Sequence, residues 1–192
     1  MPRGSAYNQP MANALTSVRL LLVLPFAWLM TRGDVRSAQL AAVAMIVAIV
    51  TDLLDGSVAR RLGTVSPVGG TLDHVSDFLF VTCGLFAGAT RGVFPWILPA
   101  LIAAAFAQYF IDSHWVHRTR ALRGSTLGRY NGILYFVPLC GEILIRLGLR
   151  FLQPALVLVV WLLVLSTLVS MSQRVIAARR AAASPAGGTA GR

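Results

Sequence analysis

Residues 52–77 read "DLLDGSVARRLGTVSPVGGTLDHVSD" and gather most of the negative charge of the chain. The whole sequence has seven acidic residues, and four of them fall within this stretch: Asp52, Asp55, Asp73 and Asp77. The segments on both sides are apolar for most of their length. If the fold brings the four carboxylates together, they must hold cations or protons, because each negative charge opposes ionisation of the others.

The composition around this stretch is that of an integral membrane protein. Of the 192 residues, 56% are hydrophobic and 12% are charged, and the mean hydropathy is +0.70. Soluble domains carry about 25% charged residues. We therefore predict an all-α integral membrane fold, with a single domain over residues 1–180 and a disordered tail over residues 181–192. Six segments have near the ~20 residues that a membrane-spanning helix needs: 13–31, 38–60, 67–90, 94–115, 130–148 and 153–176.

The arginines predict the orientation of these spans. All 17 basic residues are arginines, and placing both termini in the cytoplasm best satisfies the positive-inside rule. Twelve arginines then lie at the inner side: Arg3, Arg19, Arg60, Arg61, Arg118, Arg120, Arg123, Arg129, Arg174, Arg179, Arg180 and Arg192. The other five lie at the outer side: Arg32, Arg36, Arg91, Arg146 and Arg150. We expect a multi-pass protein of a prokaryotic plasma membrane, with the four aspartates facing the cytoplasm.

The spacing of the aspartates predicts a site for divalent metal ions. Asp52 and Asp55 are three residues apart, and Asp73 and Asp77 are four apart, so each pair falls on one face of a helix. A short turn between the two helices would bring both pairs to one space. Carboxylate oxygens suit Mg²⁺ or Mn²⁺, and two such ions ~3.5–4 Å apart are a common clamp for phosphoryl oxygens.

The residues between the acids favour a phosphate ligand. Arg60 is a bidentate donor for phosphate oxygens. Gly56 and Ala59 continue the helix face of the first aspartate pair, and Gly69 continues that of the second. Their small size leaves room for a ligand against the helix backbone. Ser66 lies in the loop "LGTVSPVGG", which can wrap a ligand through this side chain and free backbone amides.

This stretch resembles the signature of the CDP-alcohol phosphotransferases, which is D-x2-D-G-x2-A-R, a spacer and G-x3-D-x3-D. All eight fixed positions are matched: Asp52, Asp55, Gly56, Ala59, Arg60, Gly69, Asp73 and Asp77. The start of the first span, "NALTSVRLLLVLP", resembles the N-x-L-T-x-x-R opening common in the family. Ala12 stands where the family usually has proline.

The resemblance implies a reaction and assigns residues to it. The family transfers a substituted phosphate from a CDP-linked lipid, such as CDP-diacylglycerol, to an alcohol and releases CMP. The four aspartates are implied to hold two divalent ions, Mg²⁺ or Mn²⁺, and Asp77 to be the base that deprotonates the acceptor hydroxyl. Arg19 is expected to meet a phosphate. The implied donor- and CMP-binding residues are Asn13, Thr16, Gly56, Ala59, Arg60, Ser66 and Gly69.

The resemblance also implies a homodimer in contact with membrane lipids, and we expect no nucleic-acid partner. Small residues in the third and fourth predicted spans suit close contact between helices. They are Gly84, Ala87, Gly88, Ala103, Ala104 and Ala105. The same residues could instead serve packing within one protomer.

The sequence does not identify the acceptor alcohol. The length and the first span look most like phosphatidylglycerophosphate synthases, but His74 and Phe78 stand where those enzymes usually have Pro and Lys. Glycerol 3-phosphate is slightly favoured, ahead of inositol phosphate and of unphosphorylated alcohols such as serine or inositol. Four arginines of a predicted inner loop are candidates for an acceptor phosphate, or a topological anchor at anionic lipids: Arg118, Arg120, Arg123 and Arg129. The sequence assigns no role to Asp112, His114, His117 or Glu142.

Two rival functions use the same aspartates. A cation or proton transporter also places acids within membrane helices, but usually near the bilayer midplane on broken helices. Here the acids lie near one face and come with a framework of glycine and arginine. A catalytically inactive protein that only binds a CDP-lipid is the other rival, and the complete motif argues against it.

Overall fold

The protein is built of helices over the part of the chain that the computed structural model describes. The backbone is described for residues 9–62, 67–116 and 131–183, and the side chains for residues 17–51, 53, 74–108, 131–177 and 179. No strand occurs in these backbone ranges, so the all-α prediction is confirmed there. The elements are α1 (Gln9–Met30), α2 (Val35–Leu62), α3 (Pro67–Thr90), α4 (Ile97–Val116), α6 (Phe136–Arg146), the 3₁₀ turn η1 (Arg150–Leu152) and α7 (Gln153–Ala183).

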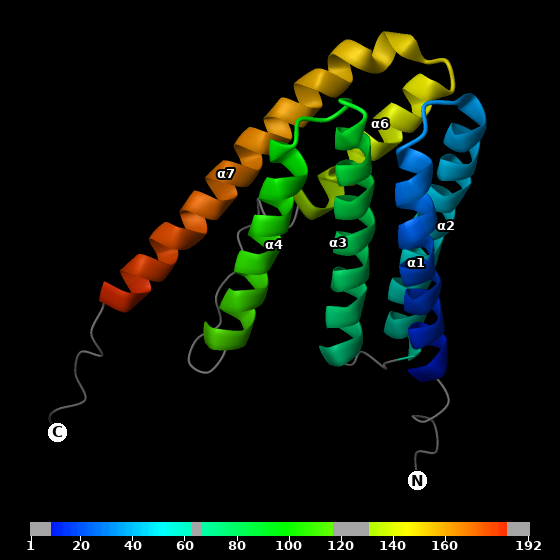
Figure 1. Ribbon diagram of the computed structural model, residues 1–192. Coiled ribbons are helices and arrows are strands. Elements are labelled where there is room, and N and C mark those ends of the chain that lie inside the picture. The colour runs from blue at the N-terminus through cyan, green and yellow to red at the C-terminus, as the bar shows by residue number, and fades with distance from the viewer. Residues whose placement is uncertain (1–8, 63–66, 117–130, 184–192) are drawn as a thin grey trace, which may run out of the picture.

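The helices form a bundle with two chemically different ends. α1 packs against both α2 and α3, while α6 packs against α2, α3 and α7. α7 runs obliquely to α1, α2 and α3 (Figure 1). α1 and α3 begin, and α2, α4 and α7 end, at the same end of the bundle (Figure 1). We call this the aspartate end, because the helix segments that carry Asp52, Asp55, Asp73 and Asp77 lie there. The opposite end, with the turns after α1, α3 and α6, is the far end.

The contact between α1 and α3 forms the centre of the core. Phe26 of α1 and Phe80 of α3 are fully buried, and their rings stack with centroids 4.2 Å apart. Gly84 lies one turn further along α3. A Cβ atom at Gly84 would lie 2.6 Å from the Phe26 ring and 3.1 Å from Leu139 of α6. The absence of a side chain at Gly84 therefore allows α1 and α6 to approach α3 closely.

Gly84 and Gly88 of α3 serve packing within the protomer. A Cβ atom at Gly88 would lie 2.5 Å from the ring of Phe94, just as one at Gly84 would meet Phe26. Ala87 is also buried inside the bundle. These residues were candidates for contact between two copies of the chain, and the structure uses them inside one copy. The homodimer stays a prediction.

The surface of the bundle is apolar over much of α1, α2 and α7. Leu21 and Leu24 are 75% and 76% exposed, and leucines, valines and isoleucines are exposed along the other two helices. Soluble monomers rarely expose apolar patches of this extent. Among the described residues one helix, Arg150–Ala177, is long and apolar enough to cross a membrane. Shorter apolar stretches are Ser17–Met30, Val35–Thr51, His74–Thr90 and Ile97–Gln108. The arrangement of six spans stays a prediction.

The helix limits differ from the predicted spans at two places. The predicted span 130–148 is divided at Tyr135, which separates a helical turn at residues 131–134 from α6. Pro138 accounts for the break, because proline donates no backbone hydrogen bond and its ring crowds the carbonyl four residues earlier. α7 continues to Ala183, so the first residues of the predicted tail are helical, and residues 184–192 lie outside the described residues.

A capping interaction fixes the start of α2. The backbone N–H and the hydroxyl of Ser37 each donate a hydrogen bond of 2.8 Å to the carboxylate of Asp34. These bonds lower the pKa of Asp34 below its usual value, because they stabilise the charged form. Such a cap satisfies a backbone donor that the first turn of a helix would otherwise leave free.

The close contact at Gly84 predicts the effect of adding one methyl group. Gly84→Ala should lower the midpoint of thermal unfolding in detergent, because overpacking a rigid aromatic core typically costs about 1–3 kcal/mol. Gly132→Ala is the matched control, since a Cβ atom there meets nothing within 4 Å. That control should be neutral or slightly stabilising, because alanine favours helix over glycine by about 1 kcal/mol. Equal effects of the two substitutions would contradict the packing assignment.

Candidate active site

The helices place the four aspartates of the motif at one end of the bundle. Asp52 and Asp55 lie in the second half of α2, and Asp73 and Asp77 lie in the first half of α3. Only residues 63–66 separate the two helices, so the end of α2 and the start of α3 lie at the same end (Figure 1). Both pairs are therefore on helices, as their spacing predicted. The side chains of Asp52, Asp55 and Asp73 lie outside the described residues.

The carboxylate of Asp77 is held by an arginine from another helix. Nη1 of Arg19, in α1, donates to Oδ1 of Asp77 at 2.5 Å and to the hydroxyl of Ser76 at 3.2 Å. Arg19 is 1% exposed and Asp77 is 28% exposed. The arginine thus lies inside the bundle, and the carboxylate lies between it and the surface. Asp77 keeps an accessible side while its other side is fixed by charge and hydrogen bonding.

This ion pair gives Arg19 a contact that the sequence did not predict. Among the described residues its guanidinium contacts Asp77 and Ser76, and the contact with a phosphate expected from the sequence stays a prediction. A buried arginine needs a paired charge, because removing one partner of a buried pair leaves an uncompensated charge that costs several kcal/mol. The arrangement can orient Asp77 and balance its charge.

The other residues assigned to the donor lie on the same helix ends or outside the described residues. Asn13 and Thr16 lie in α1, Gly56, Ala59 and Arg60 lie in the last turns of α2, and Gly69 lies in the first turn of α3. Their side chains are not among those described. Ser66 lies outside the described residues altogether, as do His117 and the four arginines offered for the acceptor, Arg118, Arg120, Arg123 and Arg129. These assignments stay predictions.

The metal site also stays a prediction. Among the described side chains no group of three or more His, Cys, Asp or Glu could hold a metal ion, but of the four aspartates only Asp77 is included. The donor set itself fits hard divalent cations, because it consists of carboxylate oxygens at helix positions that repeat every three or four residues. Asp112 and His114 lie in α4, with side chains outside the described set.

The structure shows the partner of Glu142, a residue to which the sequence assigned no role. Glu142 is 4% exposed, and its Oε1 accepts a hydrogen bond of 2.8 Å from Nη1 of Arg91. Arg91 follows the last residue of α3, so this pair lies at the far end. From residue 77 to residue 91 a helix rises about 20 Å at ~1.5 Å per residue. Glu142 is therefore no part of the aspartate site.

Two polar pairs that the sequence analysis missed join α7 to the helical segment before α6. Ser166 donates to the side-chain oxygen of Asn131 at 2.7 Å, and the hydroxyls of Tyr135 and Thr167 lie 2.8 Å apart. Asn131 and Thr167 are buried. The available signal was the spacing, since Asn131 and Tyr135 are four residues apart and both interrupt apolar sequence. Their bonds fasten α7 to the bundle.

Comparisons with known proteins add to this geometry. The family model described as CDP-alcohol phosphatidyltransferase matches residues 10–169. A cardiolipin synthase (CMP-forming) of Streptomyces coelicolor is 34% identical over 95 residues, which is 47% of this chain and 44% of that protein. A probable phosphatidylglycerophosphate synthase of Mycobacterium tuberculosis is 29% identical over 102 residues, or 52% and 49%. The matches thus span about half the length of these relatives. No solved structure matches the chain.

The ion pair predicts a coupling between Arg19 and Asp77 that a double-mutant cycle can measure. Arg19→Gln and Asp77→Asn should each lower the free energy of unfolding, and the double variant should lose less than the sum, by about 1–3 kcal/mol. Thermal or denaturant unfolding in detergent measures the free energy of unfolding of the wild type, the two single variants and the double variant. Arg36→Gln, at an exposed position of α2, serves as the control partner for Asp77→Asn. The effects of Arg36→Gln and Asp77→Asn on the free energy of unfolding should add to within about 0.5 kcal/mol. If the effects of Arg19→Gln and Asp77→Asn add equally well, the ion pair is contradicted.

Proposed function

Because the chain belongs to the CDP-alcohol phosphatidyltransferase family, we propose that it transfers a phosphatidyl group from CDP-diacylglycerol or a similar CDP-lipid to an alcohol and releases CMP. The observation that carries this proposal is the complete aspartate motif, divided between the end of α2 and the start of α3 at one end of the bundle. The family match over residues 10–169 includes both helices. Family membership removes the basis for the rival reading as a transporter.

The reaction exchanges one oxygen on phosphorus for another. The acceptor oxygen forms a bond to the phosphorus that carries the diacylglycerol, and the bond from that phosphorus to the bridging oxygen of the pyrophosphate breaks. CMP leaves with the bridging oxygen, and the proton of the acceptor hydroxyl passes to Asp77. Asp77 suits this role, since its partly exposed carboxylate can meet an incoming hydroxyl while Arg19 holds its inner side.

The proposed cofactor is a pair of divalent ions, Mg²⁺ or Mn²⁺, held by Asp52, Asp55, Asp73 and Asp77. Bound there, the ions would neutralise the pyrophosphate and stabilise the departing CMP. The chain's own residues do the rest: Arg60 donates to phosphate oxygens, and Gly56 and Gly69 let the nucleotide approach the helix backbones. Asn13, Thr16, Ala59 and Ser66 complete the proposed donor site.

We place this chemistry in a membrane. The apolar surface of α1, α2 and α7 supports that location, as does the long apolar helix Arg150–Ala177. α1 begins and α7 ends at the aspartate end (Figure 1), which agrees with an even number of crossings. By the positive-inside rule, the aspartate end faces the cytoplasm of a prokaryotic cell. A homodimer is part of the proposal and rests on family resemblance.

The proposed acceptor is a phosphorylated polyol, with glycerol 3-phosphate ahead of inositol phosphate. The name of the Mycobacterium tuberculosis relative, a probable phosphatidylglycerophosphate synthase, supports this order. Arg118, Arg120, Arg123 and Arg129 are the proposed contacts of the acceptor phosphate. The Streptomyces coelicolor relative is named for cardiolipin. Because cardiolipin carries two phosphatidyl groups on one glycerol, phosphatidylglycerol is a second candidate acceptor, beside serine and inositol.

Release of CMP from CDP-diacylglycerol by purified protein tests the function. Glycerol 3-phosphate should support the fastest release in a panel with inositol phosphate, phosphatidylglycerol, serine and inositol. EDTA should abolish the activity and excess Mg²⁺ or Mn²⁺ should restore it, because four uncompensated carboxylates would repel the pyrophosphate. Absence of CMP release with every acceptor would sink the proposal, and full activity in EDTA would remove the metal assignment alone.

Asp77→Asn should block turnover and largely spare binding of CDP-diacylglycerol, because the amide cannot take the acceptor's proton. Loss of a general base commonly reduces turnover about 10²–10⁴-fold. Asp73→Asn is the comparison, since it should weaken donor binding as well as turnover. Donor affinity and rate are measured for both variants across a titration of Mg²⁺, which separates a lost base from a weakened metal site. A near wild-type rate for Asp77→Asn would rule out the base role.

A further inference from the structure

A pocket lies at the far end of the bundle, away from the aspartates. Its volume is about 840 Å³. The turns that follow α1 and α3, the last turn of α6, η1 and the start of α7 line it. Arg91 belongs to this pocket and lies about 20 Å from Asp77 along the direction of α3. The pocket is therefore separate from the candidate active site.

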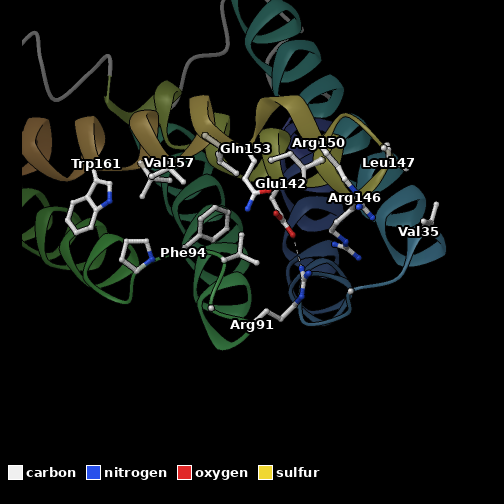
Figure 2. Close-up of a pocket in the computed structure, with 18 residues that line it drawn as sticks. Val35, Arg91, Phe94, Glu142, Arg146, Leu147, Arg150, Gln153, Val157 and Trp161 are labelled. Atoms are coloured by element: carbon white, nitrogen blue, oxygen red, sulfur yellow. Dashed lines mark hydrogen bonds and ion pairs between the residues drawn. The ribbon is translucent and has the colours of Figure 1, made fainter.

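The lining of this pocket carries a net positive charge. It contains three arginines and one glutamate, a net charge of +2: Arg91, Arg146, Arg150 and Glu142. The Arg91–Glu142 ion pair of 2.8 Å balances two of these charges. Arg146 and Arg150 have no carboxylate partner among the described residues. Figure 2 shows Arg146 and Arg150 close to the Arg91–Glu142 pair.

Arg146 and Arg150 differ in their exposure and in their hydrogen bonds. Nη2 of Arg146 donates to the backbone oxygens of Leu29 and Asp34 at 3.3 and 3.2 Å, and Nη1 donates to the sulfur of Met30 at 3.8 Å, which together fix its guanidinium. Its Nε is buried and has no hydrogen-bond partner among the described residues. The side chain of Arg150 is exposed and makes no ion pair or hydrogen bond with the described residues. Gly148, with φ of 116°, forms the turn that brings both arginines to one pocket.

The pocket changes from polar to apolar along α7. Gln153, Val157 and Trp161 follow one another at intervals of four residues, so they lie on one face and span about 12 Å. Figure 2 shows Gln153 beside the charged groups, Val157 further along, and Trp161 at the opposite end. Phe94, which is buried, faces this part of α7 from the turn after α3. A ligand that filled the pocket would be charged at one end and apolar at the other.

We propose that this pocket binds an anionic phospholipid, with its phosphate on Arg146 and Arg150 and an acyl chain along Val157 and Trp161. Charge complementarity selects the phosphate, because guanidinium–phosphate contacts are charge-assisted and often bidentate. The apolar half selects a lipid over free phosphate, which would leave that half in contact with water. The site rests on the membrane location proposed above and is independent of the phosphatidyl transfer.

Fluorescence quenching of Trp161 tests the proposal on the full chain in phosphatidylcholine–detergent micelles. Phosphatidylglycerol with brominated acyl chains is titrated in, and brominated phosphatidylcholine reports nonspecific quenching of the exposed tryptophans. The excess quenching by phosphatidylglycerol should saturate and should disappear in Trp161→Phe. Arg150→Gln should raise the half-saturating lipid fraction about fivefold, as expected for loss of one partly exposed charge-assisted contact. Added salt should weaken binding in the wild type.

Arg36→Gln is the matched control, because Arg36 is exposed at the far end and does not line the pocket. It should leave the titration unchanged. Equal quenching by the two lipids, or equal effects of Arg150→Gln and Arg36→Gln, would overturn the proposal. Full displacement by inorganic phosphate would also overturn it and would indicate a site for free anions. CMP release plays no part in these measurements, so they stand whether or not the proposed reaction does.

Discussion

The close contact of α1 with α3 is the constraint on which the rest of the structure depends. Arg19 and Phe26 are seven residues apart on α1, and their partners Asp77 and Gly84 are seven apart on α3. Two nearly parallel helices keep such a register, because seven residues complete close to two turns. The ring of Phe26 against Gly84 therefore sets the position at which Arg19 meets Asp77. The packing of the core therefore also determines where the proposed base lies.

Local sequence patterns predicted the helices. They could not predict the contacts between residues that are far apart in the sequence. The aspartate spacing predicted the helical pairs at the end of α2 and the start of α3, because helix periodicity is a local property. The partner of Asp77 is 58 positions away and that of Glu142 is 51 away. No periodicity specifies which arginine reaches which carboxylate across such separations. Only the packing of whole helices decides it, and the packing depends on the shape of side chains such as Phe26.

The break at Tyr135 illustrates a different limit. Hydropathy treats residues 130–148 as one apolar run, although Pro138 removes a hydrogen bond within it. The polar side chains of Asn131 and Tyr135 then find partners on α7 rather than facing the apolar surface. Both features were visible in the sequence as single residues. Their combined effect is an interrupted helix that is hydrogen-bonded to α7, and only the structure shows it.

The two ion pairs of α3 have a mechanical consequence. In the first half of α3, Asp77 is tied to α1 through Arg19, and just beyond the end of α3, Arg91 is tied to α6 through Glu142. A helix anchored at these two points to two different neighbours resists sliding along its axis, because a shift of one turn, about 5.4 Å, would break both pairs together. The segment of α3 from Asp77 onward is therefore held at a fixed axial position between α1 and α6. Rearrangement of the aspartate end on ligand binding must come from motion of the other helices around it.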